Sequence, residues 1–131
     1  MEIDSEQIIQ YWISEADEAF EVAGHLFDKK DFSYALFFCH LALEKILKAI
    51  YVLHKGEHAP PIHNLHRLSK LAGIKMNDAQ IEILLLATSF NIEARYPDIK
   101  RTFRKKCSKD YVQEQMISIR GLFSWLKKMM T

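Results

Sequence analysis

Apolar residues recur at steps of three and four along most of the chain, a spacing that places them on one face of an α-helix. The first run predicts a helix from Asp4 or Ser5 to Phe27, with these residues buried: Ile9, Trp12, Ile13, Ala16, Phe20, Ala23 and Phe27. The polar segment 28–31 separates this helix from a second one that extends to about His54. Asp31 or Ser33 is positioned to cap the second helix.

The segment 55–63 contains one glycine and two adjacent prolines, which predict the end of the second helix. A short helix is predicted over 64–72, and Gly73 ends it. Asn77, with Gln80 three residues later, predicts a capping box at the start of the next helix. That helix is expected to reach about Ile92, with these residues on its buried face: Ile81, Leu84, Leu85 and Thr88.

Pro97 interrupts the helical pattern, so the segment 95–98 is expected to form a turn. Ser108 is the predicted N-cap of the last helix. The spacing of its apolar residues predicts burial of Val112, Met116, Ile119, Leu122, Phe123 and Leu126.

The 131 residues show no strand-like alternation, internal repeat or domain linker. The pattern therefore predicts an all-α fold, an antiparallel, up-and-down helical bundle with four long helices plus one short helix. We expect a single domain over residues 1–131, because 49% hydrophobic residues suffice for one sizeable core.

Two cysteines, Cys39 and Cys107, are too few for a disulfide framework. The acidic N-terminal segment does not resemble a signal peptide, and no apolar run reaches the ~18 residues of a membrane span. We therefore expect a cytoplasmic protein that makes no membrane contact.

The net charge is +1, but charged residues are unevenly distributed along the chain: residues 1–28 are acidic and residues 100–109 are basic. The basic segment predicts a nucleic-acid patch, with Phe103 available for stacking and cations at Lys100, Arg101, Arg104, Lys105 and Lys106. Two other interpretations remain open. The segment is a solvated loop, or it contacts the acidic first helix of the same or a partner chain.

The predicted second helix is mostly apolar but carries a narrow polar stripe. His40, Glu44 and Lys48 are four residues apart and so lie within a sector about 80° wide. The stripe is either the exposed edge of a central helix or the lining of a cleft or dimer seam. In the second case Glu44 needs a cationic partner, and Arg95 is the best candidate from outside the helix.

His54, His58, His63 and His66 surround the two prolines, but no paired cysteine or fixed acidic ligand accompanies them. We expect no metal site and no cofactor. In this interpretation the histidines are solvated, and His63 caps the short helix.

Three sequence elements occur in order along nearly the whole chain. The first is A-x-x-x-x-H-x-A-x-E-K-x-L-K-A, from Ala35 to Ala49. The second is His63-Asn64-Leu65 with Leu68, and the third is Arg95-Tyr96-Pro97-Asp98. Together they resemble the HEPN-domain family. The resemblance implies a compact antiparallel helical bundle, usually a homodimer, that acts beside a minimal nucleotidyltransferase, often in a toxin–antitoxin pair. Many members of the family are metal-independent ribonucleases, and the family name records a proposed nucleotide-binding role.

The chain departs from the ribonuclease members in one respect. Their active motif is an Arg followed after four to six residues by a His. The last histidine here is His66, so neither Arg67 nor Arg95 has such a partner. In that mechanism the His transfers a proton and the Arg holds the scissile phosphate, so a chain without this pair lacks both functions.

We therefore predict no catalytic residues. Instead we expect a dimeric module that binds a nucleotide, RNA phosphate or a nucleotidyltransferase partner, through His40, Glu44, Lys48, His63, Arg95, Tyr96 and Asp98. One alternative is a ribonuclease with a non-standard site that combines His63 and Arg95. Another is a purely structural dimerisation scaffold, in which Tyr96 packs and Arg95 pairs locally with Glu93 or Asp98.

Overall fold

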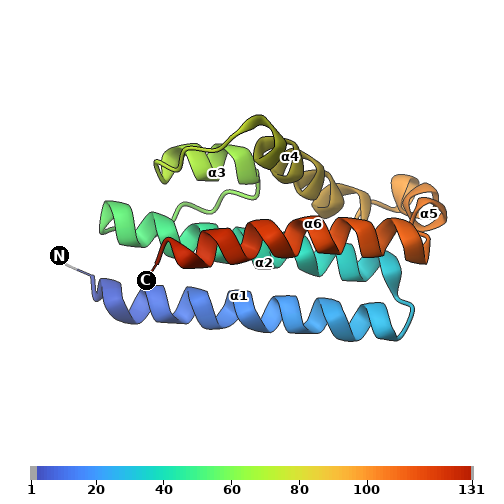
Figure 1. The fold of residues 1–131 in the computed structure, drawn as a ribbon, viewed down its shortest axis with the longest axis horizontal. Coiled ribbons are helices and arrows are strands. Elements are labelled where there is room, and N and C mark those ends of the chain that lie inside the picture. The colour runs from blue at the N-terminus through green and yellow to red at the C-terminus, as the bar shows by residue number, and fades with distance from the viewer. Residues whose placement is uncertain (1–2, 131) are drawn as a thin grey trace.

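A computed structural model describes residues 3–130, apart from the side chains of Pro97 and Asp98. These residues form helices α1 (Ser5–Asp28), α2 (Phe32–Lys55), α3 (Leu65–Leu71), α4 (Asp78–Glu93), α5 (Pro97–Lys106) and α6 (Lys109–Lys128). Figure 1 shows α1, α2 and α6 running lengthwise, with α3 and α4 above α2 and α5 at one end. The long helices α1, α2, α4 and α6 alternate in direction, so the predicted all-α antiparallel bundle is confirmed.

Helix α2 is the centre of the fold, because it contacts each of the other five described helices. Its fully buried residues lie on nearly every side of the helix and include Leu36, Leu43, Ile46, Leu47 and Ile50. A helix surrounded by neighbours is apolar around most of its circumference, as the sequence of α2 is. The few polar groups on this helix are therefore carried into the interior.

Helix α1 packs along α2 through small side chains. Its buried residues are Ala16, Ala19 and Ala23, while the larger apolar residues that the sequence predicts as buried are only partly covered. Small residues allow two helices to approach closely, and the bulky side chains then fill the edges of the contact. One such bulky residue is Phe20 of α1, which packs against Phe123 of α6 with the ring centroids 5.1 Å apart.

Most helix starts follow from their capping residues. Asn77 and Gln80 form the predicted capping box of α4, and Ser108 caps α6 by accepting a hydrogen bond from the Tyr111 amide. Asp31 occupies the N-cap position of α2, but its side chain makes no capping hydrogen bond. Helix α2 ends at Gly56, whose φ of +66° suits glycine.

Helix α5 is missing from the sequence prediction of four long helices plus one short helix. A turn at Ala94 and Arg95 is followed by Tyr96 as N-cap and by a helix that starts at Pro97. Proline is favoured in the first turn of a helix because its missing N–H has no intrahelical partner there. The basic segment is thus largely helical rather than a loop.

The predicted buried face of α4 is partly wrong. Leu84 is buried, but Leu85 is 52% exposed, and the face instead contains Ala87, Phe90 and Asn91. All six residues predicted as the buried face of α6 are buried. Within residues 3–130, no helix combines the length and apolar character needed to cross a bilayer.

The central position of α2 predicts a large difference between two of its leucines. Leu47→Ala removes a side chain with no solvent exposure and should lower the free energy of unfolding by about 2–5 kcal/mol. Leu53→Ala on the same helix is the control, because Leu53 is 45% exposed and its loss should cost about 0.5 kcal/mol or less. Urea unfolding of both variants measures the difference, and equal losses would contradict the central placement of α2.

Candidate ligand-binding site

Four ionisable side chains meet at the middle of α2. His40, Glu44 and Lys48 follow one another at successive turns of the helix, and His63 reaches them from the segment before α3. We call these four residues the Glu44 cluster. The residues from α2 are 0–8% exposed, so the interpretation of the stripe as an exposed helix edge is wrong.

Glu44 is the common partner in this cluster. Its Oε1 lies 2.8 Å from Nδ1 of His63 and 3.3 Å from Nε2 of His40, and its Oε2 accepts a hydrogen bond from Nζ of Lys48 at 3.2 Å. A buried carboxylate needs such partners, because leaving water costs it several kcal/mol. The cluster therefore satisfies a charge that α2 forces into the interior.

The pKa of the Glu44 carboxyl is set by opposing effects. Burial raises this pKa, but His40, His63 and Lys48 together outweigh burial and lower it to about 2. We assign the larger share of the histidine effect to His63, because its contact is shorter and has hydrogen-bond geometry. Glu44 is therefore an anion at neutral pH.

His40 is fixed inside the bundle by α4. Its Nδ1 lies 3.1 Å from the carbonyl oxygen of Ala87, and a carbonyl only accepts, so Nδ1 carries the hydrogen. Its Nε2 is buried close to Glu44, but the two atoms do not form a well-aligned hydrogen bond, and no other described residue bonds this nitrogen. A neutral imidazole would point a lone pair at the carboxylate, whereas an imidazolium would point an N–H there. His40 therefore joins α2 to α4 and is out of reach of a ligand.

His63 is the accessible member of the Glu44 cluster, with 59% of its side chain exposed. Because ionised Glu44 only accepts hydrogen bonds, Nδ1 of His63 must donate. Nε2 then faces outward, and no described residue bonds it. The expectation that His63 caps the short helix is wrong, since the Asn64 side chain caps α3 by accepting from the Arg67 amide.

Lys48 is held on both sides. Besides its bond to Glu44, its Nζ lies 5.2 Å from the centroid of the Trp12 ring on α1. The sequence predicts Trp12 only as a buried residue of the first helix, because a cation–π contact is not visible in a hydrophobic pattern. Lys48 is thus engaged within the chain rather than free to bind a ligand.

Arg95 lies outside the Glu44 cluster. Its guanidinium donates to the side chain of Asn91, one turn earlier, at 3.3 Å, and it makes no ion pair with Glu44 among the described residues. The predicted pair of Arg95 with Glu44 is therefore wrong: His63 supplies the contact from outside α2. Tyr96 is 54% exposed rather than packed, and the Asp98 side chain lies outside the described residues.

Two residues of α4 have roles that the sequence did not suggest. Asn91 is buried and accepts from Arg95, and the Thr88 hydroxyl accepts from the Leu65 amide at 3.1 Å, which fixes the start of α3. The four-residue spacing of Asn91 and Arg95 was a visible signal for the first contact. The second contact joins segments far apart in the sequence.

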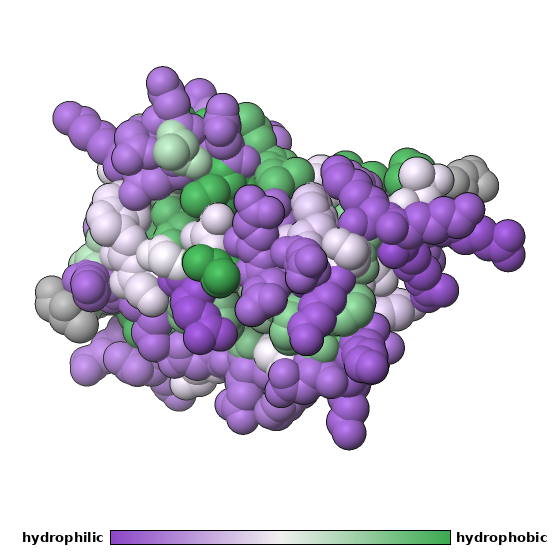
Figure 2. All heavy atoms as spheres, turned by 45° about the vertical axis from the view of Figure 1, so that its right-hand side comes forward, coloured by the Kyte–Doolittle hydropathy of each residue, from purple (hydrophilic) through white to green (hydrophobic). Residues whose placement is uncertain are grey.

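The basic residues of α5 divide into separate contacts. Lys100 and Arg104 lie over the Tyr34 ring, and Lys106 lies 5.3 Å from the Tyr111 centroid. Arg101 and Lys105 are exposed. Figure 2 brings the α5 end of the molecule forward and shows hydrophilic side chains over much of that face.

Another histidine of the group around the two prolines has a structural contact. Nδ1 of His54, near the end of α2, lies 2.7 Å from the carbonyl oxygen of Ala72 at the end of α3. This contact ties the two helices together near the turn that separates them. Among the described residues, no group of three His, Cys, Asp or Glu side chains is arranged to hold a metal ion.

The family of the chain is decided by its match to a family model. The HEPN domain model matches residues 9–129. The chain belongs to the HEPN domain family. The sequence elements that resemble the family occupy different parts of this HEPN domain. His40, Glu44 and Lys48 lie inside α2, and Arg95 lies in the turn after α4.

A solved structure has the same fold as this HEPN domain. The crystal structure of TT1696 from Thermus thermophilus superposes with a TM-score of 0.76, covering 92% of this chain and 96% of that one. The two sequences are 19% identical, so the similarity concerns the fold. Comparison with curated proteins gives no significant match.

The lowered pKa of Glu44 predicts how the stability of this HEPN domain depends on pH. The pKa of the Glu44 carboxyl is lower in the folded state than in the unfolded state. The contribution of ionised Glu44 to the free energy of unfolding is therefore complete above about pH 5. It is lost as the pH falls from the ordinary value of 4.5 toward about 2. The loss attributable to Glu44 should be about 3 kcal/mol.

Glu44→Gln tests this assignment. The variant should be less stable at pH 7, because Lys48 stays buried without its anion, and it should lose less further stability between pH 5 and pH 2 than the wild type does. The exposed Glu82→Gln on α4 is the control and should follow the wild type. Parallel pH profiles for wild type and Glu44→Gln in chemical denaturation would refute the role of Glu44.

Proposed function

We propose that this HEPN domain binds the phosphate of a nucleotide or RNA at the exposed edge of the Glu44 cluster. The observation that carries the proposal is the state of His63: its Nδ1 is held by a buried carboxylate, while Nε2 is open to solvent. A carboxylate behind an imidazole fixes the orientation of the ring. With Nδ1 donating to Glu44, the protonated imidazole also donates from Nε2, and this second hydrogen bond can reach a phosphate oxygen.

The roles of the other predicted residues differ under this proposal. Lys48 and His40 position and neutralise Glu44 and do not contact the ligand, since both are buried. Arg95 lies in the turn after α4, and its guanidinium is bonded to the Asn91 side chain and makes no contact with the Glu44 cluster among the described residues. We therefore assign His63 and Arg95 to different phosphates, which favours an RNA strand or an extended nucleotide over a single phosphate.

The protein partners belong to the same proposal. The resemblance to the family supports a homodimer and a minimal nucleotidyltransferase partner in the cytoplasm, as in toxin–antitoxin pairs. Tyr96 and the exposed cations Arg101 and Lys105 are surface groups that such contacts could use.

Binding of ATP and of a short single-stranded RNA tests the proposal. Fluorescence anisotropy with labelled ligands should detect binding by the wild type, weakened about tenfold in His63→Ala and more modestly in Arg95→Ala. His25→Ala is the matched control, because His25 is an exposed histidine on α1. Absence of binding by the wild type, or equal affinities in all the variants, would overturn the proposal. Co-purification with a nucleotidyltransferase in that case would favour the scaffold interpretation.

Ribonuclease activity is a second candidate, and the same contact favours it. A histidine held by a carboxylate is the arrangement of a general base, and Nε2 of His63 is open to a substrate hydroxyl. In this hypothesis the 2′-hydroxyl of RNA loses its proton to His63 as its oxygen bonds to the adjacent phosphorus. The bond from phosphorus to the 5′-oxygen breaks, and the released 5′-oxygen takes up a proton. Arg95 would hold the charge of a neighbouring phosphate.

Incubation of RNA with purified protein in the presence of a chelator separates the two candidates. If His63 is a general base, cleavage should persist without metal and fall at least about 100-fold in His63→Ala, while His25→Ala remains active. Intact RNA after long incubation with protein that binds it would reject the ribonuclease and leave the binding function.

A further inference from the structure

His40 has the one buried side-chain nitrogen that lacks a hydrogen-bond partner among the described residues. The residue has no solvent exposure. Its Nδ1 lies 3.1 Å from the Ala87 carbonyl oxygen on α4, and its Nε2, the unpartnered atom, lies 3.3 Å from Oε1 of Glu44. Buried polar atoms are normally paired, so the state of this ring has to be explained.

Neither neutral form of the His40 ring suits these two neighbours. A carbonyl oxygen and an ionised carboxylate only accept hydrogen bonds, while a neutral imidazole has a hydrogen on one nitrogen and a lone pair on the other. With the hydrogen on Nδ1, the lone pair of Nε2 faces Glu44, and with the hydrogen on Nε2, the lone pair of Nδ1 faces Ala87. The imidazolium has a hydrogen on both nitrogens, and the carboxylate attracts its charge.

The anion available to a charged His40 is Glu44. Lys48 on α2 and His63 from the segment before α3 also contact this carboxylate. Lys48 lies at Oε2, whereas both imidazoles lie at Oε1. The two histidines therefore share one oxygen of one carboxylate.

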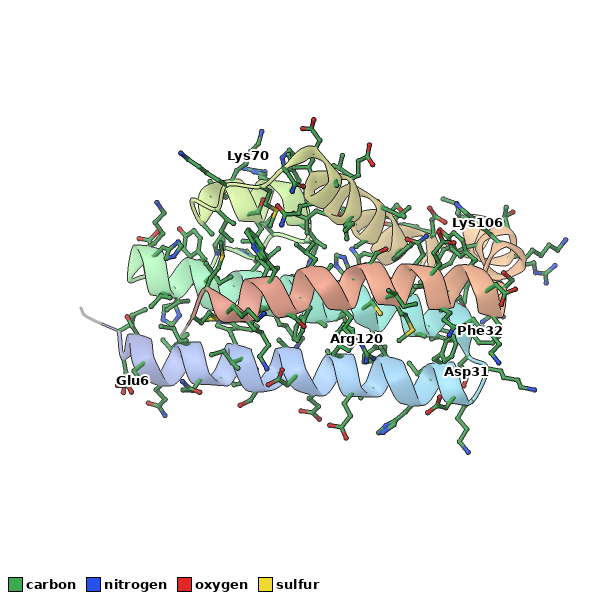
Figure 3. All side chains as sticks on the ribbon, in the orientation of Figure 1. Glu6, Asp31, Phe32, Lys70, Lys106 and Arg120 are labelled. Atoms are coloured by element: carbon green, nitrogen blue, oxygen red, sulfur yellow. The ribbon has the colours of Figure 1, made fainter. Side chains whose placement is uncertain are left out.

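The surrounding helices bring no further charge to the cluster. Helix α4 contributes the Ala87 carbonyl, α1 contributes the Trp12 ring against Lys48, and on α6 the Arg120 guanidinium lies over the Phe20 ring. In the part of the chain that the structure describes, no charged side chain of α1, α3, α4 or α5 forms an ion pair with the cluster. Figure 3 labels three charged residues of these outer helices at the edge of the molecule: Glu6, Lys70 and Lys106.

The charge on His40 acts against a charge on His63. A like charge close by disfavours protonation, and both ring nitrogens lie at the same oxygen of Glu44. His40 needs a hydrogen on each nitrogen, because both face acceptors inside the protein. His63 needs only the hydrogen on Nδ1, because its side chain is 59% exposed and water can satisfy Nε2 in either form. The outer ring is therefore the one that stays neutral.

We propose that His40 is a buried imidazolium at neutral pH and that its charge keeps His63 neutral until a ligand binds. When a phosphate arrives, His63 takes up one proton from solvent on Nε2 and donates it in a hydrogen bond to the phosphate oxygen. This last step rests on the function proposed above, whereas the charge of His40 does not. His40 is thus a positioning residue that touches no ligand but makes binding at His63 depend on pH.

NMR of the free protein tests the charge of His40. Proton–nitrogen correlation through the imidazole ring distinguishes a nitrogen that carries a hydrogen from one that holds a lone pair. Both nitrogens of His40 should carry a hydrogen at pH 7, whereas most His63 rings should carry one on Nδ1 alone. His25 on α1 is the control, because an exposed histidine loses one ring hydrogen between about pH 5 and pH 8.

Two substitutions separate the charge of His40 from its hydrogen bonds. His40→Asn keeps a donor close to Ala87 and His40→Gln keeps one close to Glu44, but both side chains are neutral. In each variant the ratio of charged to neutral His63 at pH 7 should rise about tenfold. Lys45→Gln is the matched control, since it removes a positive charge from α2 at a residue that makes no ion pair with Glu44.

Binding of a single-stranded RNA with a 5′-hydroxyl end tests the coupling to the ligand. Its phosphodiesters do not titrate near neutral pH, so a change in affinity there comes from the protein. The affinity of the wild type should fall about tenfold between pH 7 and pH 8, as uptake of one proton requires, and less steeply in His40→Gln. Lys45→Gln should keep the slope of the wild type. If no RNA binds, the proposed function fails, while the NMR result on His40 still stands.

Three results would overturn the proposal: a lone pair on either ring nitrogen of His40 at pH 7, an unchanged charge of His63 in both His40 variants, or RNA affinity that does not vary with pH. A change of His63 in only one of the two variants would reduce His40 to a hydrogen-bonding role and reject its charge. The wild-type spectrum decides the first point even where a variant does not fold.

Discussion

The buried carboxylate of Glu44 constrains the rest of the structure. Helix α2 is covered by its neighbours, so a charge at its centre must be matched from within the chain. Lys48 matches it from the same helix, and His63 matches it from the segment before α3. This requirement determines where the chain between α2 and α4 must pass, and it leaves one imidazole at the surface with a fixed orientation.

The cluster also explains why a central helix carries polar residues at a cost. Replacing a buried ion pair by apolar residues is often neutral or stabilising, so stability alone is a weak reason to keep one. Here the ionic groups connect three elements: Trp12 on α1, the carbonyl of Ala87 on α4, and His63. Apolar side chains would fill the same space without specifying these contacts, and they would leave His63 without a carboxylate.

Much of the fold could be predicted from the sequence because its signals are local. Capping residues marked the starts of α4 and α6, and helical spacing gave every buried residue of α6. Helix α5 was missed because its ten residues include few apolar ones around Phe103, too few to show an apolar period. Pro97 in the first turn was the only local sign of that helix.

The candidate sites were less predictable because they depend on contacts between distant segments. The stripe of His40, Glu44 and Lys48 was visible from helical spacing alone. Its partner was not, since choosing between His63 and Arg95 requires the path of the chain before α3 and the rotation of α4. Likewise, nothing local joined Tyr34 to Arg104, which are seventy positions apart.

The attachment of α3 has a consequence for the exposure of Glu44. A helix of seven residues is too short to be stable alone, and α3 is held by a few apolar side chains, the Thr88 hydroxyl and His54. Such a segment opens locally at a lower free energy than the whole bundle unfolds, and its amides exchange with solvent deuterium earlier. Each opening would carry His63 away and let water reach the carboxylate, so the lifetime of the closed segment sets how long the imidazole stays oriented.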